Sequence, residues 1–408
     1  MQKKKYSIPS AFKQQHSVPP VWFVTTEEGK HSRIADYSEK SINDALYSAL
    51  SEAVEFRKNT GQALLKVHIG EPATSTRLRP EYTVSSVQLL HEMGAEGVAA
   101  GDTTVAYTGK RGHRQNPPGN CIQYLELAKK HGWNISGAAG IPFVVLDRPD
   151  TSLDGIFSFS REYNPVQISG INRYREFYLA GGFNAAGCVV NHAHLTLHDL
   201  AGVAGCIKSI AMGCSALKGK YMMHQSMLPV FDGESCVQCG LCVESCPENA
   251  LSLTEEQKHP SVDAQFCIGC GECTAVCPSG AVEIHGREIS DWVRGKDTLP
   301  SRMTDYVVGL MNGKWNSTVH VLHMYTVTEK CDCVDIKQEP LISRDLGFLI
   351  GKNPFAVDLI ASRLLAREIA AESVDVDESV LRTAAVSAEY AYENYEIIPE
   401  AQVHKLFI

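Results

Sequence analysis

The chain has 408 residues, a formal net charge of −9 and 44% hydrophobic residues. That length predicts about two or three domains with a sizeable core. No run of about 18 apolar residues is present, so we expect no membrane-spanning helix. The lysine-rich start lacks the apolar stretch of a secretory signal, and we therefore expect a cytoplasmic protein.

The first 230 residues alternate between helical and strand-like patterns. Apolar residues recur at helical spacing over 41–56, and similar patterns follow further along the chain. The other helices are predicted at 84–93 and 122–131, and the strands at 64–69, 97–100, 141–147 and 187–195. Strands that alternate with helices predict an α/β domain with a mostly parallel sheet.

The alternation of helical and strand-like patterns resumes after residue 286, with predicted strands at 319–325 and 345–350. Asn353 followed by Pro354 is typical of a helix start. Asparagine caps the first turn, and proline fits the first helical position. This helix is predicted to run over 355–371.

The segment 231–286 is dense in cysteine, glycine and acidic residues. We expect it to be a small α+β insert that interrupts one α/β domain, whose two parts are 1–230 and 287–408; three successive domains are the alternative. Its charge is −8, from one base, Lys258, and nine acids: Asp232, Glu234, Glu244, Glu248, Glu255, Glu256, Asp263, Glu272 and Glu283. Such a surface disfavours nucleic acid. It suits docking to a basic face of a redox partner protein, although solubility alone would also explain the charge.

Two copies of the pattern C-x-x-C-G-x-C-x-x-x-C-P lie in this insert, at Cys236–Pro247 and Cys267–Pro278. In bacterial ferredoxins, three closely spaced thiolates ligate one [4Fe–4S] cluster and the fourth cysteine ligates the other cluster. Zinc sites use separated C-x-x-C pairs, so zinc is the weaker interpretation. The predicted ligands are Cys236, Cys239, Cys242 and Cys277 for cluster 1, and Cys267, Cys270, Cys273 and Cys246 for cluster 2.

Three histidines, His192, His194 and His198, form an H-x-H-x-x-x-H pattern. They could bind a metal, or they could supply hydrogen bonds and acid–base groups at a cleft. In parallel α/β sheets, ligands bind at the carboxyl ends of the strands. His68, Asp102 and His194 are predicted to lie near such ends, and we expect them to converge.

Lys208, Lys218 and Lys220 lie in a stretch punctuated by glycines. Such a stretch can bring backbone and cations close to an anion. The spacing does not fit a P-loop, so a nucleoside triphosphate is not indicated. The stretch could bind a phosphate- or carboxylate-bearing substrate or the phosphate of a flavin, or it could be a solvated loop. Cys331 and Cys333 flank one aspartate and could hold a metal, form a redox thiol pair or simply pack.

Several segments, in this order, resemble domain-of-unknown-function family 362, in its subgroup of iron–sulfur centre proteins with a ferredoxin-type insert. They are LLKVHIGEP, GDTTVAYTGKRG, AHLTLHDLAGVAGCIKSIAMGCSALKGKYMMH, the two cluster motifs, the CDC at Cys331–Cys333, and DLGFLIGKNPFAVD. The resemblance implies an α/β domain interrupted by a ferredoxin module and implies no established reaction. The chain departs from the family pattern at Thr196 and at Lys208-Ser209, which suggests an altered ligand preference.

Together these features predict an electron-transfer protein whose two [4Fe–4S] clusters feed a substrate or cofactor in an α/β cleft. If it is an enzyme, the expected class is an iron–sulfur oxidoreductase that acts as a reductase. A non-enzymatic ferredoxin-type carrier and a metal- or cluster-handling protein are the alternatives. The candidate catalytic residues are His194, His198 and Lys208, and the candidate cofactor-binding residues are Lys218, Lys220, Asp102 and His68.

Overall fold

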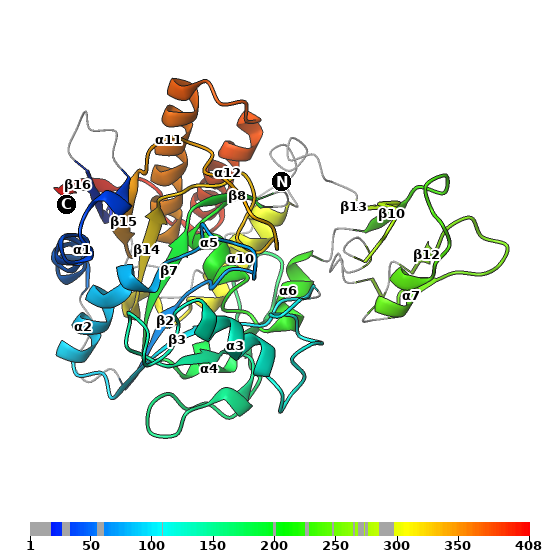
Figure 1. The fold of residues 1–408 in the computed structure, drawn as a ribbon, viewed down its shortest axis with the longest axis horizontal. Helices are drawn as coiled ribbons and strands as arrows, with labels where there is room; N and C mark the ends of the chain where they lie inside the picture. Colours follow the sequence, from blue (N-terminus) through cyan, green and yellow to red (C-terminus); the bar gives the residue numbers. More distant parts are fainter. Residues whose placement is uncertain are drawn as a thin grey trace.

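The computed structural model describes most of the chain (Figure 1). The described residues are 18–26, 33–54, 61–107, 109–198, 201–224, 228–246, 249–263, 266–267, 273, 276–284 and 298–408. Within these ranges, no helix has the length and apolar character needed to cross a membrane.

An eight-stranded sheet forms the centre of the larger part of the molecule, in the order β16-β1-β15-β14-β7-β2-β3-β4 (Figure 1). In that order the strands are Gln402–Phe407, Pro20–Thr25, Gly347–Gly351, Thr318–Met324, Cys188–His194, Gln62–Lys66, Gly97–Asp102 and Phe143–Val145. Five of the seven neighbouring pairs are parallel, and only the two pairs that involve β15 are antiparallel. The predicted α/β class with a mostly parallel sheet is thus confirmed.

Helices cover both faces of this sheet, and every residue of β7 and β14 is buried. Parallel strands buried on both faces are usually apolar throughout, whereas these two also bury polar residues: Asn191, His192 and His194 in β7, and Thr318, His320 and His323 in β14. One hydrophobic cluster joins the sheet to α1 (Glu39–Ala53), α2 (Val84–Glu92) and α3 (Ile122–Lys130). Two others join it to α5 (Cys206–Ala211), α10 (Leu299–Leu310), α11 (Pro354–Glu372) and α12 (Glu378–Tyr395).

Capping side chains begin two of the predicted helices, although α1 starts at Glu39, two residues before its predicted start. Ser38 accepts a hydrogen bond from the Ser41 N–H and begins α1. Asn353 accepts from the N–H groups of Phe355 and Ala356 and begins α11. These side-chain oxygens satisfy amides that have no partner within the helix.

Two predicted strands are shorter in the structure. The strand expected at 64–69 ends at Lys66, and the chain turns at Gly70, whose φ is 75°. The strand expected at 141–147 covers only Phe143–Val145, because the chain turns where the Arg148 N–H bonds to the Val145 carbonyl. Both ends are therefore set by turns that follow the strands.

The remaining elements of the larger part are short or peripheral. They are the hairpin β5 (Tyr163–Gln167) and β6 (Glu176–Ala180), α4 (Gly181–Ala185), β8 (Thr196–His198), β9 (Gly202–Ala204), α6 (Leu217–His224), and 3-10 helices at Ile34–Asp36, Pro80–Thr83, Pro149–Thr151 and Trp315–Ser317.

A small lobe follows α6 in the chain and lies to one side of the sheet domain (Figure 1). In it β10 (Pro229–Phe231) pairs with β13 (Val282–Ile284), β11 (Leu251–Ser252) pairs with β12 (Ser261–Val262), and α7 spans Leu241–Ser245. Its own buried cluster consists of Cys242, Leu251, Cys273 and Val282. Strands from before and after this lobe join the same eight-stranded sheet.

Candidate functional site

A cavity of about 210 Å³ lies at the carboxyl ends of β2, β3 and β7. This edge of a parallel sheet is where α/β proteins bind their ligands. The structure brings together there most of the residues singled out in the sequence: His68, Asp102, His194, His198, Lys208, Lys220, Cys331 and Cys333. Residues from five separate stretches of the chain therefore form one site.

Lys218 and His192 are not among the residues that line this cavity. The Lys218 ammonium lies 4.2 Å from the centre of the Tyr178 ring. His192 is fully buried, and its Nδ1 lies 2.8 Å from Nε2 of His323. The histidines of the H-x-H-x-x-x-H pattern thus have separate partners and do not form one metal site in this structure.

Arg111 holds two buried carboxylates at one side of the cavity. Its Nη2 lies 2.9 Å from Asp102 Oδ2, and its Nη1 lies 3.0 Å from Glu71 Oε1. The Lys66 ammonium is 3.0 Å from the other oxygen of Asp102. Burial raises the pKa of Asp102, but Lys66 and Arg111 outweigh this effect and hold the pKa below its ordinary value. Arg111 was not predicted as a site residue, although it lies in GDTTVAYTGKRG, one of the segments that resemble the family.

Lys220 is a second cation of the cavity, and its hydrogen bonds go to neutral oxygens. Its Nζ donates to Thr103 Oγ1 at 2.8 Å and to the Ser215 carbonyl at 2.6 Å. Burial lowers the pKa of Lys220 to about 8. The amine is therefore mostly protonated at pH 7, and its charge is available to an anionic ligand.

His194 is paired with Asp332 on the opposite wall. Its Nδ1 lies 2.7 Å from Asp332 Oδ2, and its Nε2 lies 2.8 Å from the Tyr325 carbonyl. Because both ring nitrogens face acceptors, both carry protons and the ring is an imidazolium. Burial lowers the pKa of His194, but the Asp332 carboxylate outweighs burial and raises it above the ordinary value.

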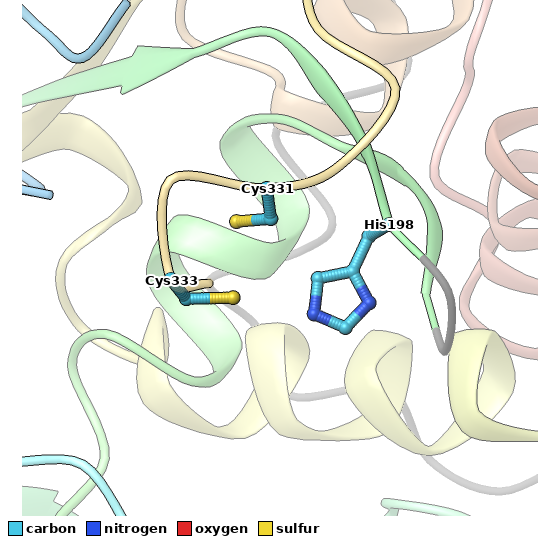
Figure 2. A group of neighbouring side chains, drawn as sticks. All are labelled: His198, Cys331 and Cys333. Carbon is cyan, nitrogen blue, oxygen red and sulfur yellow. The ribbon is translucent and has the colours of Figure 1, made fainter. Parts of the chain in front are cut away.

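Cys331 and Cys333 lie on a tight turn that is closed by a 3.0 Å hydrogen bond from the Val334 N–H to the Cys331 carbonyl. The Lys208 ammonium lies 3.0 Å from Cys331 Sγ and 3.6 Å from Cys333 Sγ. The His198 ring lies beside both thiols (Figure 2), and the candidate ligand atoms of these three residues lie within 4.8 Å of one another. This group could hold a metal ion or act through its sulfurs.

The hydrogen bonds of the group favour a thiolate over a metal ion. The Ala201 N–H donates to His198 Nδ1 at 3.1 Å, so the neutral ring carries its proton on Nε2. Metal-bound histidines usually donate a hydrogen bond from the second ring nitrogen, whereas this nitrogen accepts one. The hydrogen bond with Cys333, together with the charge of Lys208, lowers the pKa of Cys331 to about 5, and the shared proton raises that of Cys333.

A second sulfur-lined cavity lies in the small lobe. Its lining includes Cys236, Cys239, Cys242 and Cys277, the four residues that the motif spacing assigns to cluster 1. Four thiolates around one space are the donor set of a [4Fe–4S] cluster. Burial raises the pKa of Cys277, but hydrogen bonds from Ser279 and from backbone N–H groups outweigh it and lower the pKa.

The residues assigned to cluster 2 are described in part. Cys273 is buried, and the Ala250 N–H donates to Cys246 Sγ at 3.2 Å. Cys267 is half-buried, and Cys270 lies outside the described residues. The described members of this set belong to the same lobe as the cluster 1 cysteines.

Comparison with known protein families gives a match that covers most of this chain. The family described as "Domain of unknown function (DUF362)" matches residues 63–363, which include the α/β cavity and the whole small lobe. No curated protein matches the chain.

Proposed function

We propose that this chain, which belongs to the DUF362 family, is an iron–sulfur electron-transfer protein. In this proposal the small lobe holds two [4Fe–4S] clusters, and electrons pass between these clusters and a small anionic molecule in the α/β cavity. The clusters supply single electrons, and the α/β domain supplies binding, orientation and protons.

The grouping of four cysteines around one space in the lobe is the observation that carries this proposal. Cys236, Cys239 and Cys242 come from one copy of the motif, whereas Cys277 comes from the other copy. In two-cluster ferredoxins the fourth cysteine of each run serves the opposite cluster in the same way. A zinc site built from separated pairs has no reason to exchange cysteines between two repeats.

The connection between lobe and cavity supports a shared function. Helix α6 contributes Lys220 and His224 to the cavity and ends at His224, and β10 begins at Pro229. The lobe therefore leaves the sheet domain close to the cavity wall. A redox relay needs its donor and acceptor near each other, and this connection places the root of the lobe beside the proposed binding site.

The charges of the two regions suit different partners. The acidic lobe suits a redox partner protein with a basic docking face, because complementary charges steer association. The cavity places Lys208 and Lys220 where an anionic ligand would meet them, and His194 offers a nearby proton. Proton donation by a histidine to a reduced ligand is a common role in such sites.

A reductive titration of the anaerobically purified full-length chain tests the proposal. We expect dithionite to bleach the broad visible absorption of oxidised clusters and to produce electron paramagnetic resonance signals of two interacting reduced clusters. The matched control is Cys121→Ser, which changes a buried cysteine at the start of α3, outside both sulfur groups. A chain that takes up no electrons after iron and sulfide reconstitution would contradict the proposal.

A further inference from the structure

We propose that Cys331 and Cys333 form a reversible dithiol–disulfide centre that reacts with small anionic disulfides in the α/β cavity. The centre uses only side chains of the α/β domain. The centre is therefore independent of the cluster cysteines, and an experiment that disproves it would not disprove the proposed clusters.

The geometry of the turn keeps the two thiols together and directs them to the cavity. Both sulfurs lie near the Lys208 ammonium, at 3.0 and 3.6 Å. The residue between them, Asp332, is anchored, because its carboxylate lies 2.7 Å from His194 Nδ1 and its carbonyl accepts from the Glu71 N–H at 3.0 Å. These contacts fix the turn, and both cysteines line the cavity together with the aspartate.

The environment of the sulfurs is suited to a nucleophilic thiolate. A cation next to a cysteine stabilises the thiolate, which is the reactive form in disulfide exchange. Lys208 provides that cation, and the proton on His198 Nε2 lies on a ring beside the thiols (Figure 2). A metal ion would instead meet an ammonium group and a protonated ring nitrogen at this place.

The class of ligand follows from the unbalanced charge of the cavity. Lys66 and Arg111 are neutralised by Asp102 and Glu71, at distances of 2.9 to 3.0 Å. Lys220 is held by a hydroxyl and a carbonyl oxygen, and among the described residues the Asp147 and Asp102 carboxylates act on it without a direct ion pair. A disulfide that carries carboxylates would satisfy this charge while its sulfurs reach the cysteine pair.

The reaction balances without a further reactant. The Cys331 thiolate attacks one sulfur of the ligand, a mixed disulfide forms, and the first ligand thiolate leaves. Cys333 then loses its proton and attacks Cys331 Sγ, so that the Cys331–Cys333 bond forms and the second ligand thiolate leaves. The ligand disulfide is reduced to two thiols, which take up one proton from Cys333 and one from solvent, and the two protein sulfurs are oxidised to a disulfide.

The test uses the reduced full-length chain, anaerobic conditions and oxidised glutathione as the probe, followed by alkylation and tryptic mass spectrometry. The peptide that contains both cysteines runs from residue 331 to residue 337 and includes no other cysteine. In the wild type we expect this peptide to lose two hydrogen atoms and to take no alkyl label. In Cys333→Ser the reaction should stop at a glutathione adduct on Cys331, and Cys121→Ser should behave as the wild type.

A neutral probe, 2-hydroxyethyl disulfide, tests the ligand class. We expect oxidised glutathione to react several-fold faster than the neutral probe, and Lys220→Gln to abolish this preference. The control Lys130→Gln, which removes an exposed charge at the end of α3, should keep it. Circular dichroism verifies that each variant is folded.

Three results would overturn the proposal. A dithiol peptide that is still fully labelled after treatment with oxidised glutathione would show that the pair is not a redox centre. Equal rates with both probes would show that the centre does not prefer anionic disulfides. A stoichiometric metal ion that co-purifies with the chain, blocks alkylation of this peptide and disappears in Cys331→Ser would show a metal site instead.

Discussion

The two sulfur-bearing regions of this protein place the same side chain in opposite surroundings. In the small lobe, eight cysteines crowd into two short motifs within an acidic segment. In the α/β cavity, two cysteines are buried or half-buried beside Lys208 and His198. Thiolates that are close in sequence and without a nearby cation suit a cluster, whereas thiolates held by an ammonium group suit nucleophilic chemistry. The groups that surround a cysteine thus indicate its chemistry better than the number of cysteines in the region does.

Removal of two cysteines assigned to cluster 1 should have the largest effect and tests whether the two regions differ in iron binding. The double variant Cys236→Ser, Cys239→Ser should lose about four of about eight irons, because one cubane loses half of its thiolates. The double variant Cys331→Ser, Cys333→Ser should keep about eight irons, since those residues lie in the other region. Colorimetric iron analysis of the anaerobically purified proteins measures both. The reverse pattern would show that the roles of the two regions had been exchanged.

Arg111→Met should cause the largest loss of stability in the cavity region. The change leaves Asp102 and Glu71 buried with a cation missing, and an uncompensated buried charge costs roughly 3–5 kcal/mol. The measurement is the free energy of unfolding from urea denaturation followed by circular dichroism.

The control for Arg111 is Arg344→Met, which removes a partly exposed pair with Glu368 and should cost about 1 kcal/mol or less. Equal losses in the two variants would argue against a tightly coupled charge network under the cavity. Iron content should stay the same in both, because neither residue belongs to the small lobe.

Lys208→Gln should sharpen the comparison by removing the cation beside the cavity thiols, while the hydrogen bond between Cys331 and Cys333 remains. In the wild type the pKa of Cys331 is lowered to about 5, so its reactivity should persist as the pH falls from 9 and should decline only near that value. An unperturbed cysteine loses its thiolate below about pH 8.5. Without the Lys208 charge the inflection should move up by roughly one unit or more, which is about a twofold loss of rate at pH 6 and about a tenfold loss near pH 4.

Iodoacetamide alkylation of the 331–337 peptide across this pH range measures the effect, with Lys130→Gln as the control. An inflection that stays in place in the Lys208 variant would show that the ammonium group does not set the thiolate population. The distance of 3.0 Å between Lys208 Nζ and Cys331 Sγ would then have no electrostatic consequence.

Asn353→Ala should have the smallest effect on the free energy of unfolding, and this effect should be confined to the sheet domain. The substitution removes the cap that accepts from the Phe355 and Ala356 N–H groups at the start of α11, and such a loss costs about 1 kcal/mol. Asn353→Asp keeps a capping oxygen and should cost less. Urea denaturation measures both, and a loss of iron in either variant would show that the stability of the lobe depends on this helix.

Features set by neighbouring residues could be predicted from the sequence. The start of α11 was predicted from Asn353 and Pro354, whereas α1 begins after the cap Ser38, two residues before its predicted start. The α/β class follows from the alternation of strand and helix patterns. The edge strand β16 escaped prediction, because most of its residues are exposed and show no alternation of apolar and polar positions.

The chemistry of the cavity depends on contacts that no local pattern records. Lys208 and Cys331 are 123 residues apart and meet only after the sheet has formed. The sequence predicted Lys208 as an anion-binding residue, and its sulfur partners emerged from the fold. Arg111 likewise takes its role from Asp102 and Glu71, which the ends of two different strands bring to it.

Iron and acid-labile sulfide per chain, measured on the anaerobically purified wild type, test the central proposal most directly. The account predicts about eight of each, four per cluster, and their loss when all eight motif cysteines are changed to serine. A content of about four irons or fewer after reconstitution, or iron that remains in the eight-serine variant, would contradict it.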